Sequence, residues 1–551
     1  MKKSKTKFLL FLIIIFIFLG LVFFDNISKS NSVSFKNTNE LNRFFREKHG
    51  FVFNVSDTLV LSHNQFIYQD NYTLTELETN LTDFYSIKFN AVDSRAGNKK
   101  IINKSQTIKN YTDTFSGKKS YNLNKAIYLG SFMFILWMLE IVPIFLTALL
   151  PIIAGPMLGL VNFDQLASCY GNHNIFLFFG GFILALALER WKVHDQITAR
   201  LLHYLGDSLQ NILLGFILSA ALLSMWISNT ATTLIMLPIA LSVISRVPEI
   251  MKAKFSVLLL LGLAYAANIG GMATLVGSPP NIQMAGILEQ QFGIEITFFD
   301  WISIGLPISI FLIIILFLFF KFKLGVHGQY KIQHIRNLEP WSSNQKKVLI
   351  VFLSVVFCWV FRDLIQSFFE IKFKDLLPVL IASFFLFVIP SHDIKGGSLL
   401  KWDDTKEIPW GILLLFGGGL ALAKILELNG VIDMVIEFIM GISNYQLWTI
   451  ILILVIISVF ATEVISNLAL VTLLIPVVGF FAKEAGLNII TLALPVALAA
   501  SCAFMFPIST PPNAIVYSSG KISMNKMFRI GIILNIVSIS VITFLSFILL
   551  S

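Results

Sequence analysis

Apolar runs long enough to cross a bilayer recur along most of the chain. They lie near residues 8–24, 126–141, 143–160, 174–190, 256–275, 301–320, 347–366, 376–391, 409–428, 487–506 and 527–550. Because roughly 20 apolar residues suffice for one helical span, the pattern predicts an all-α polytopic membrane protein with about 11 transmembrane helices.

Two further apolar stretches, 208–247 and 445–482, are too long for one span and carry polar residues at their centres. The first centre is Ser228-Asn229-Thr230 and the second is Ser466-Asn467-Leu468. Non-helical backbone at membrane depth is tolerated only where it is buried in protein or lines a cavity. Each stretch therefore predicts a re-entrant hairpin that enters and leaves on one side.

Other landmarks also occur twice, in the same order. Gly277-Ser278-Pro279-Pro280-Asn281 corresponds to Ser509-Thr510-Pro511-Pro512-Asn513, and a glycine-rich segment precedes each hairpin, at 179–181 and 416–419. Proline removes a backbone donor and glycine lets the chain turn, so the paired motifs predict two broken helices. Paired breaks in two halves of a chain are a sequence signature of a transporter's binding site.

Loop charge predicts the orientation. Lysine and arginine are concentrated at the N-terminus and in 190–200, 246–254, 321–347, 395–406 and 521–529, and they are scarce in 161–173, 288–300 and 429–444. The segment 362–374 is a basic exception. The positive-inside rule then places the N-terminus in the cytoplasm, and residues 25–124 and Ser551 outside the plasma (inner) membrane. The two hairpins open on opposite sides, which predicts an inverted repeat.

The chain accordingly divides into four parts. These are a first transmembrane helix (1–24), an extracytoplasmic insertion (25–124), a first repeat (125–340) and a second repeat (341–551). Alternating apolar and polar residues, as in Phe51–Val55 and Tyr85–Phe89, predict that the insertion is small and β-rich.

Composition and motif content argue against several classes of function. The chain is 56% hydrophobic and 13% charged, and its net charge of +9 follows from the basic loops, so a nucleic-acid partner is not indicated. The sequence has no phosphate-binding GxxxxGK loop, which argues against ATP as the energy source. A clustered acid, base or metal set that would suit an enzyme is also lacking, and Cys169, Cys358 and Cys502 form no disulfide or metal pattern.

The polar tips suit ion and anion binding without a formal charge in the membrane. Free N–H groups at a helix N-terminus attract a carboxylate or sulfate, and carbonyls freed where helices end suit sodium. Glu463 follows Thr462 beside the second tip, and its role there, structural or functional, stays open at this stage. His173 is a lone histidine near an interface, for which we predict no function.

The run Ser224–Thr232, the two proline-containing motifs and the Thr462–Asn467 segment resemble the divalent anion:sodium symporter family. The resemblance covers about 126–551 and the first span. It implies hairpins with Ser-Asn-Thr tips, a homodimer formed by a scaffold domain, and elevator-type movement of a transport domain.

Site residues also follow from the resemblance. One sodium site would involve Ser224, Ser228, Asn229 and Gly277, and a second would involve Thr462, Ser466, Asn467, Ser509 and Pro511. The anion would contact Asn229, Thr230, Asn467, Ser278 and Thr510. Two features depart from the family: Leu468 stands where the second tip usually has threonine, and the insertion 25–124 is unusually long.

We therefore expect sodium-coupled import of a divalent anion, such as the C4-dicarboxylate succinate, across the lipid bilayer. Three alternatives stay open: a dicarboxylate exchanger, a sodium–sulfate symporter of the same fold, and a membrane-anchored sensor that uses residues 25–124.

Overall fold

The structure is a computed structural model that describes residues 123–139, 142–325, 329–332, 339–392, 397–431 and 446–550, and five short strands nearer the N-terminus. The contacts divide the chain into two compact units, one of Ile15–Tyr128 and one of Leu129–Ser551 together with Met1–Ile14. The predicted first span, 1–24, lies outside the described residues.

The five strands all fall within the predicted insertion. They are β1 (Ser32–Ser34), β2 (Leu59–Ser62), β3 (Gln65–Tyr68), β4 (Ser86–Ile87) and β5 (Ser116–Lys118). They form two small antiparallel sheets, in the orders β1-β5-β4 and β2-β3. Most of the insertion lies outside the described residues, so its β-rich fold stays a prediction.

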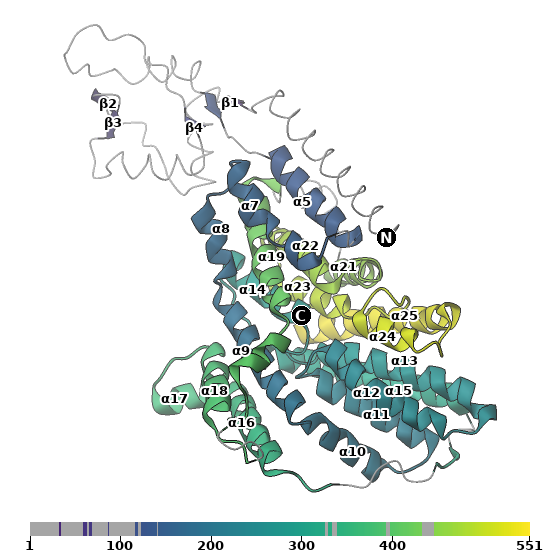
Figure 1. The fold of residues 1–551 in the computed structure, drawn as a ribbon. Helices are drawn as coiled ribbons and strands as arrows, with labels where there is room; N and C mark the ends of the chain where they lie inside the picture. The colour runs from purple at the N-terminus through teal and green to yellow at the C-terminus, as the bar shows by residue number, and fades with distance from the viewer. Residues whose placement is uncertain are drawn as a thin grey trace, which may run out of the picture. The chain divides into compact units, whose positions relative to one another are not determined.

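The other named elements of the described chain are helices (Figure 1). Those before residue 340 are α5 (Leu123–Leu139), α6 (Ile144–Thr147), α7 (Leu150–Met157), α8 (Phe163–Tyr170), α9 (His173–Arg190), α10 (Val193–Leu205), α11 (Leu209–Ser224), α12 (Asn229–Ser245), α13 (Glu249–Gly271), α14 (Pro279–Phe292) and α15 (Phe298–Leu324). Those after it are α16 (Ser343–Val360), α17 (Arg362–Phe369), α18 (Leu376–Val388), the 3-10 helix η2 (Trp402–Glu407), α19 (Trp410–Leu428), α21 (Leu447–Ala461), α22 (Asn467–Glu484), α23 (Ile489–Ala500), α24 (Pro511–Ser518) and α25 (Met524–Leu550).

Local sequence explains where the helices around the predicted motifs begin. Ser228 and Ser466 cap α12 and α22, because each hydroxyl accepts a hydrogen bond from a backbone N–H three residues further on. Pro279 and Pro511 are the first residues of α14 and α24, a position where the missing N–H costs nothing. The helix ends therefore coincide with the polar motifs.

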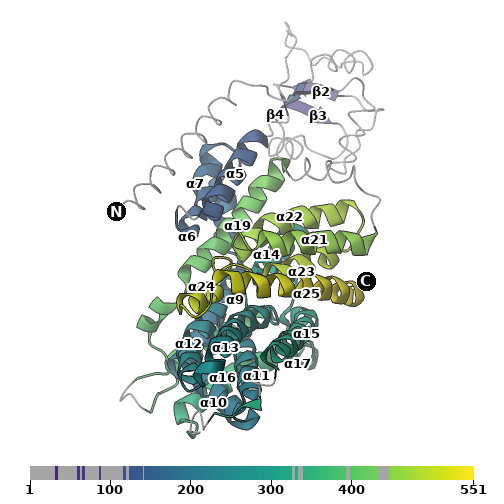
Figure 2. The same cartoon turned by 90° about the vertical axis from the view of Figure 1, so that its right-hand side faces the viewer.

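The two halves of the chain are interleaved. Helix α14, from the first half, packs along α22, and helix α24, from the second half, packs against α12 (Figure 2). Each hairpin therefore lies beside the broken helix of the other half.

The end of each hairpin opposite its tip contacts a different connector, which here means a segment that joins two predicted spans. Leu209, which starts α11, donates its N–H to the Tyr330 carbonyl at 2.9 Å. In the second hairpin, the Phe480 ring of α22 packs on Phe292, at the end of α14, with ring centroids 4.7 Å apart. Tyr330 belongs to a connector predicted to be cytoplasmic, and Phe292 to one predicted to be extracytoplasmic.

Connectors that were assigned to the same side also contact one another. Arg190 forms an ion pair with Asp404, and Gln345 donates to the Trp191 carbonyl at 3.0 Å. On the other set of connectors, Lys374 forms an ion pair with Glu289 at 2.7 Å. Within each set, these contacts agree with the common side assigned from charge.

The lengths and composition of the helices identify candidate membrane spans. By length and composition, seven described helical segments can cross a membrane: Phe163–Arg190, Glu249–Gly271, Phe298–Leu324, Ser343–Val360, Trp410–Leu428, Asn467–Glu484 and Met524–Leu550. The run 143–160, predicted as one span, contains α6 and α7, which are separated by a two-residue turn because Pro151 near the start of α7 interrupts regular bonding. The total of about 11 helices, which rests on the length of apolar runs, stays a prediction.

Candidate substrate and cation site

The first hairpin tip is a turn of four residues between α11 and α12. Ser224, the last residue of α11, donates from its hydroxyl to Asn229 Oδ1 at 2.6 Å. Ser224 is fully buried, whereas Ser228, Asn229 and Thr230 are half-buried. The tip therefore presents a fixed amide and two hydroxyl groups from Ser228 and Thr230.

The second tip repeats this bond. Thr462 donates from Oγ1 to Asn467 Oδ1 at 2.7 Å, and the same hydroxyl lies 2.7 Å from the Ala500 carbonyl. Four residues separate Asn467 from Thr462, and four also separate Asn229 from Ser224. The duplicated sequence therefore yields a duplicated contact.

The two helix breaks are also held by equivalent bonds. Asn281 Nδ2 donates to the carbonyls of Gly271 and Thr274 at 2.9 and 2.8 Å. Asn513 Nδ2 donates to the carbonyls of Ala503 and Phe506 at 2.9 and 3.2 Å. In each half, the asparagine after the paired prolines closes the unwound segment into a loop.

Backbone oxygens converge at Gly277 in the first break. A Cβ there would lie 2.6 Å from the Gly271 carbonyl and 3.0 Å from the carbonyls of Ser224 and Met225. Only glycine leaves room at this position, and the oxygens it admits are of the kind that a hard cation binds.

The second break is bonded to the first half of the chain. Asn268 on α13 donates to Thr510 Oγ1 at 3.0 Å, and the Tyr265 hydroxyl donates to the Phe504 carbonyl at 2.7 Å. Both α13 residues are almost fully buried. The loops of the two broken helices are thus joined through α13.

Glu463 is a structural organiser of the second break. Its carboxylate is 2% exposed and accepts hydrogen bonds from the backbone N–H groups of Phe504, Met505 and Phe506 at 2.7, 2.8 and 3.2 Å. Asn535 on α25 donates to the same carboxylate at 2.8 Å. Its sequence neighbours do not reveal this role, because every partner lies at least forty positions away in the chain.

Comparison with known proteins identifies the family. Residues 134–486 match the citrate transporter (CitMHS) family. The chain is 37% identical over 449 residues to the sodium-dependent dicarboxylate transporter SdcS of Staphylococcus saprophyticus, covering 78% of this chain and 86% of that protein. It is 36% identical over 421 residues to SdcS of Staphylococcus aureus strain USA300, covering 73% and 81%. The chain belongs to the divalent anion:sodium symporter family.

Membership in the divalent anion:sodium symporter family makes the chain an integral membrane transporter rather than an enzyme. Among solved structures, the YdaH transporter of Alcanivorax borkumensis matches with a TM-score of 0.46 and 9% identity, covering 70% of this chain and 87% of that one.

The predicted site residues differ in their exposure. Ser278 and Thr510 are 2% and 3% exposed, so both hydroxyls are enclosed. Leu468, beside the second tip, is buried at 7% exposure, whereas Thr230, its counterpart, is half-buried. The two tips of this divalent anion:sodium symporter family member are therefore alike in their amide but unlike in the next side chain.

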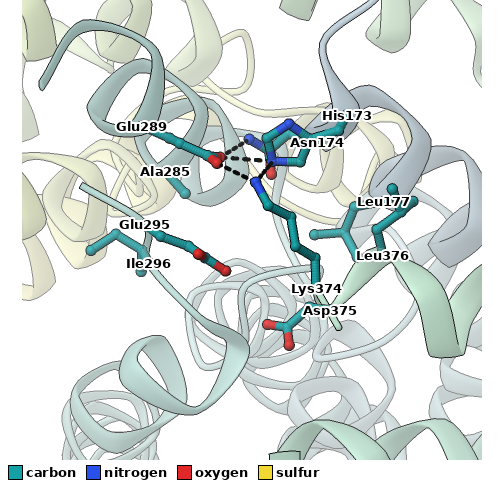
Figure 3. Close-up of a pocket in the computed structure, with 10 residues that line it drawn as sticks. All are labelled: His173, Asn174, Leu177, Ala285, Glu289, Glu295, Ile296, Lys374, Asp375 and Leu376. Carbon is teal, nitrogen blue, oxygen red and sulfur yellow. Dashed lines mark hydrogen bonds and ion pairs between the residues drawn. The ribbon is translucent and has the colours of Figure 1, made fainter. Parts of the chain in front are cut away.

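A separate small polar pocket lies at the far end of α14 (Figure 3). Glu289 points there toward His173, Asn174 and Lys374, at 2.8, 2.9 and 2.7 Å. Partial burial alone would raise the pKa of Glu289, but these bonds outweigh it and lower the pKa to about 2. Glu289 is ten residues beyond Pro279, about 15 Å along the helix, so this pocket is distinct from the break. His173, for which the sequence predicted no function, is a partner in this cluster.

Proposed function

We propose that the transporter imports a divalent organic anion together with sodium ions, and that a C4-dicarboxylate such as succinate is its substrate. The duplicated bond from Ser224 to Asn229 and from Thr462 to Asn467 is the main structural support for this proposal. It fixes two neutral amides at two helix starts without placing a formal charge in the membrane. The printed names of the SdcS relatives, which specify sodium and dicarboxylate, support the same assignment.

The proposed sodium sites lie where each tip meets a break. Ser224, Ser228, Asn229 and Gly277 would hold one ion, and Thr462, Ser466, Asn467, Ser509 and Pro511 the other. The convergence of the Ser224, Met225 and Gly271 carbonyls at Gly277 supports the first site, since sodium prefers neutral oxygen ligands of this kind. For the second site, support comes from the Thr462 hydroxyl, which lies between Asn467 Oδ1 and the Ala500 carbonyl.

The proposed anion site lies between the two tips. Asn229, Thr230, Asn467, Ser278 and Thr510 would contact the substrate. Helices α12, α22, α14 and α24 begin at or directly after these residues, and helix starts carry partial positive charge. Free N–H donors come from the starts of α12 and α22, because α14 and α24 each begin with two prolines. Four such starts can stabilise two carboxylates without a lysine or arginine.

An inverted repeat and elevator-type movement complete the proposal. The first hairpin opens toward Tyr330 and the second toward Phe292, which supports opposite orientations in the membrane. The bonds from α13 to the second break link both broken helices, so the tips and breaks would move as one transport domain. We place the protein as a homodimer in the plasma (inner) membrane, with the N-terminus cytoplasmic and residues 25–124 and the C-terminus extracytoplasmic.

Uptake of labelled succinate into proteoliposomes, with and without an inward sodium gradient, tests this function. Accumulation that requires the sodium gradient is the expected result. Uptake driven only by internal dicarboxylate would favour an exchanger, and uptake of labelled sulfate in place of succinate would favour a sulfate carrier. If no anion is transported at all, the sensor hypothesis for residues 25–124 gains support.

A further inference from the structure

Three helices from both halves meet at Gly419. Helix α19 carries this glycine and packs against α14 and α22. A Cβ on Gly419 would overlap with Gln283 Nε2 of α14 and would lie 2.9 Å from Thr472 Oγ1 of α22. The glycine therefore allows two polar side chains to approach one point of the backbone.

Both polar side chains are buried and lack partners. Gln283 is 0% exposed and Thr472 is 2% exposed. Within the described part of the chain, neither end of the Gln283 amide nor Thr472 Oγ1 has a hydrogen-bond partner. A buried polar group without a partner costs about 1–3 kcal/mol, so two such side chains at one place are suited to bind a small polar ligand or ion.

Pro476 adds a third free group. Proline has no backbone N–H, so the Thr472 carbonyl, four residues earlier in α22, lacks its usual helical donor. The first hairpin has a proline at the corresponding place, Pro238, but the residue four before it is the apolar Leu234. Both halves thus have a carbonyl that lacks its helical donor. Only in the second half does the residue with this carbonyl, Thr472, also have a polar side chain.

We propose that Thr472 and Gln283 bind a sodium ion at a third cation site, separate from the two at the tips. The Thr472 hydroxyl and carbonyl are neutral, hard oxygen ligands, which suit a monovalent alkali cation. A half-turn of the Gln283 amide brings its oxygen to the place of Nε2, the Gln283 atom nearest to Gly419, and adds a ligand of the same kind. Thr472 lies five residues beyond Asn467, about 7.5 Å along α22, so one ion cannot serve both places.

The third ion has an energetic consequence. This inference rests on the proposed sodium coupling. Two sodium ions only balance the charge of a dianion, whereas three move one net positive charge inward with each substrate. The membrane potential then contributes about 2.3 kcal/mol per 100 mV to import. The site would therefore make accumulation depend on voltage.

Reversal-potential measurements in proteoliposomes test the site. With fixed gradients of sodium and labelled succinate, the voltage at which net flux stops gives the number of sodium ions per substrate. We expect three for the unmodified protein and two for Thr472→Val and Gln283→Leu. Thr472→Ser keeps the hydroxyl and should retain three. Thr543→Val, which removes another buried, unpartnered hydroxyl on α25, is the matched control and should also retain three.

For variants that no longer transport, equilibrium binding of radioactive sodium to the purified protein gives the number of bound ions and their affinity. Thr472→Val should bind one ion fewer, or bind the third about tenfold more weakly. If Thr472→Val keeps the ion count and the sodium affinity of the unmodified protein, the cluster holds only a water molecule and the inference is wrong. A count of two for the unmodified protein would also overturn it, without affecting the proposed function. Succinate transport without any sodium dependence would overturn both.

Discussion

Asn268 on α13 donates a 3.0 Å hydrogen bond to the hydroxyl of Thr510, the residue that precedes α24. The bond is buried and joins the first half of the chain to the helix break of the second half. Asn268 lies outside the sequence motifs, whereas Thr510 belongs to one of them. Asn268 therefore positions Thr510 for the proposed anion site.

Replacing Asn268 with alanine should weaken substrate binding. The change leaves the Thr510 hydroxyl without its buried donor, and losing such a partner costs about 1–3 kcal/mol. We expect at least a fivefold rise in the KM for succinate, measured as uptake into proteoliposomes. Asn429→Ala is the control, because Asn429 is also buried but bonds to the carbonyls of Ile425 and Leu160. An equal effect of both substitutions on KM would argue against a positioning role.

Alanine at either tip asparagine should abolish transport. In the proposed site, Asn229 and Asn467 each face both an ion and the anion, so one amide supports two ligands. We expect Asn229→Ala and Asn467→Ala to lose uptake, by a hundredfold or about 3 kcal/mol, while remaining monodisperse in detergent. Normal uptake by either variant would remove that residue from the site.

Helix starts at the motifs were predictable from sequence because their causes are local. Ser228 and Ser466 cap the following helices within three residues, and Pro279 and Pro511 occupy first helical positions. Such short-range rules do not depend on the rest of the fold. The duplicated motifs therefore identified the unwound segments correctly.

Long-range partners could not be predicted in the same way. Glu463 accepts hydrogen bonds from backbone N–H groups about forty residues away, and Glu289 pairs with His173 and Lys374 from other segments. A single sequence carries no signal for these pairings, since they arise only when the helices pack. The turn between α6 and α7, within the run 143–160, was not predicted for a different reason, because hydropathy counts apolar residues and does not register the interruption at Pro151.

Sodium dependence should show more than one ion per turnover. In the proposed function, the two equivalent tips provide two cation sites, and moving a dianion inward against a negative potential costs about 2.3 kcal/mol per charge per 100 mV. We expect succinate uptake to rise sigmoidally with sodium concentration, with a Hill coefficient above about 1. Replacement of external sodium by choline is the measurement. Uptake that is unchanged in choline would exclude symport and favour exchange.

Glu289→Gln should lower stability in a pH-dependent way. The folded-state pKa of Glu289 is lowered from 4.5 to about 2, so its carboxylate stabilises the fold above pH 4.5, and this contribution disappears as the pH falls toward 2. We expect the variant to lose about 2–4 °C in Tm at pH 7 and less at pH 3. Thermal unfolding in detergent at both pH values measures this. Glu249→Gln, in a pair whose carboxylate is 85% exposed, should change little, and an equal loss for Glu289→Gln at both pH values would refute the ionic explanation.

Leu468→Thr should change the choice among anions more than it changes sodium dependence. Thr230 is half-buried at its tip, whereas Leu468 is only 7% exposed, so the proposed anion site is polar on one side and apolar on the other. A hydroxyl at position 468 could donate to a carboxylate or sulfate oxygen, and sites built from hydroxyl groups discriminate more sharply than apolar ones. We expect competition by succinate, malate, citrate and sulfate against labelled succinate to be reordered, by about tenfold for at least one anion. Thr230→Val is the reciprocal control, because it removes the hydroxyl on the other side. If Leu468→Thr leaves all four competition curves unchanged, Leu468 only packs the hairpin, and the difference between the tips does not set specificity.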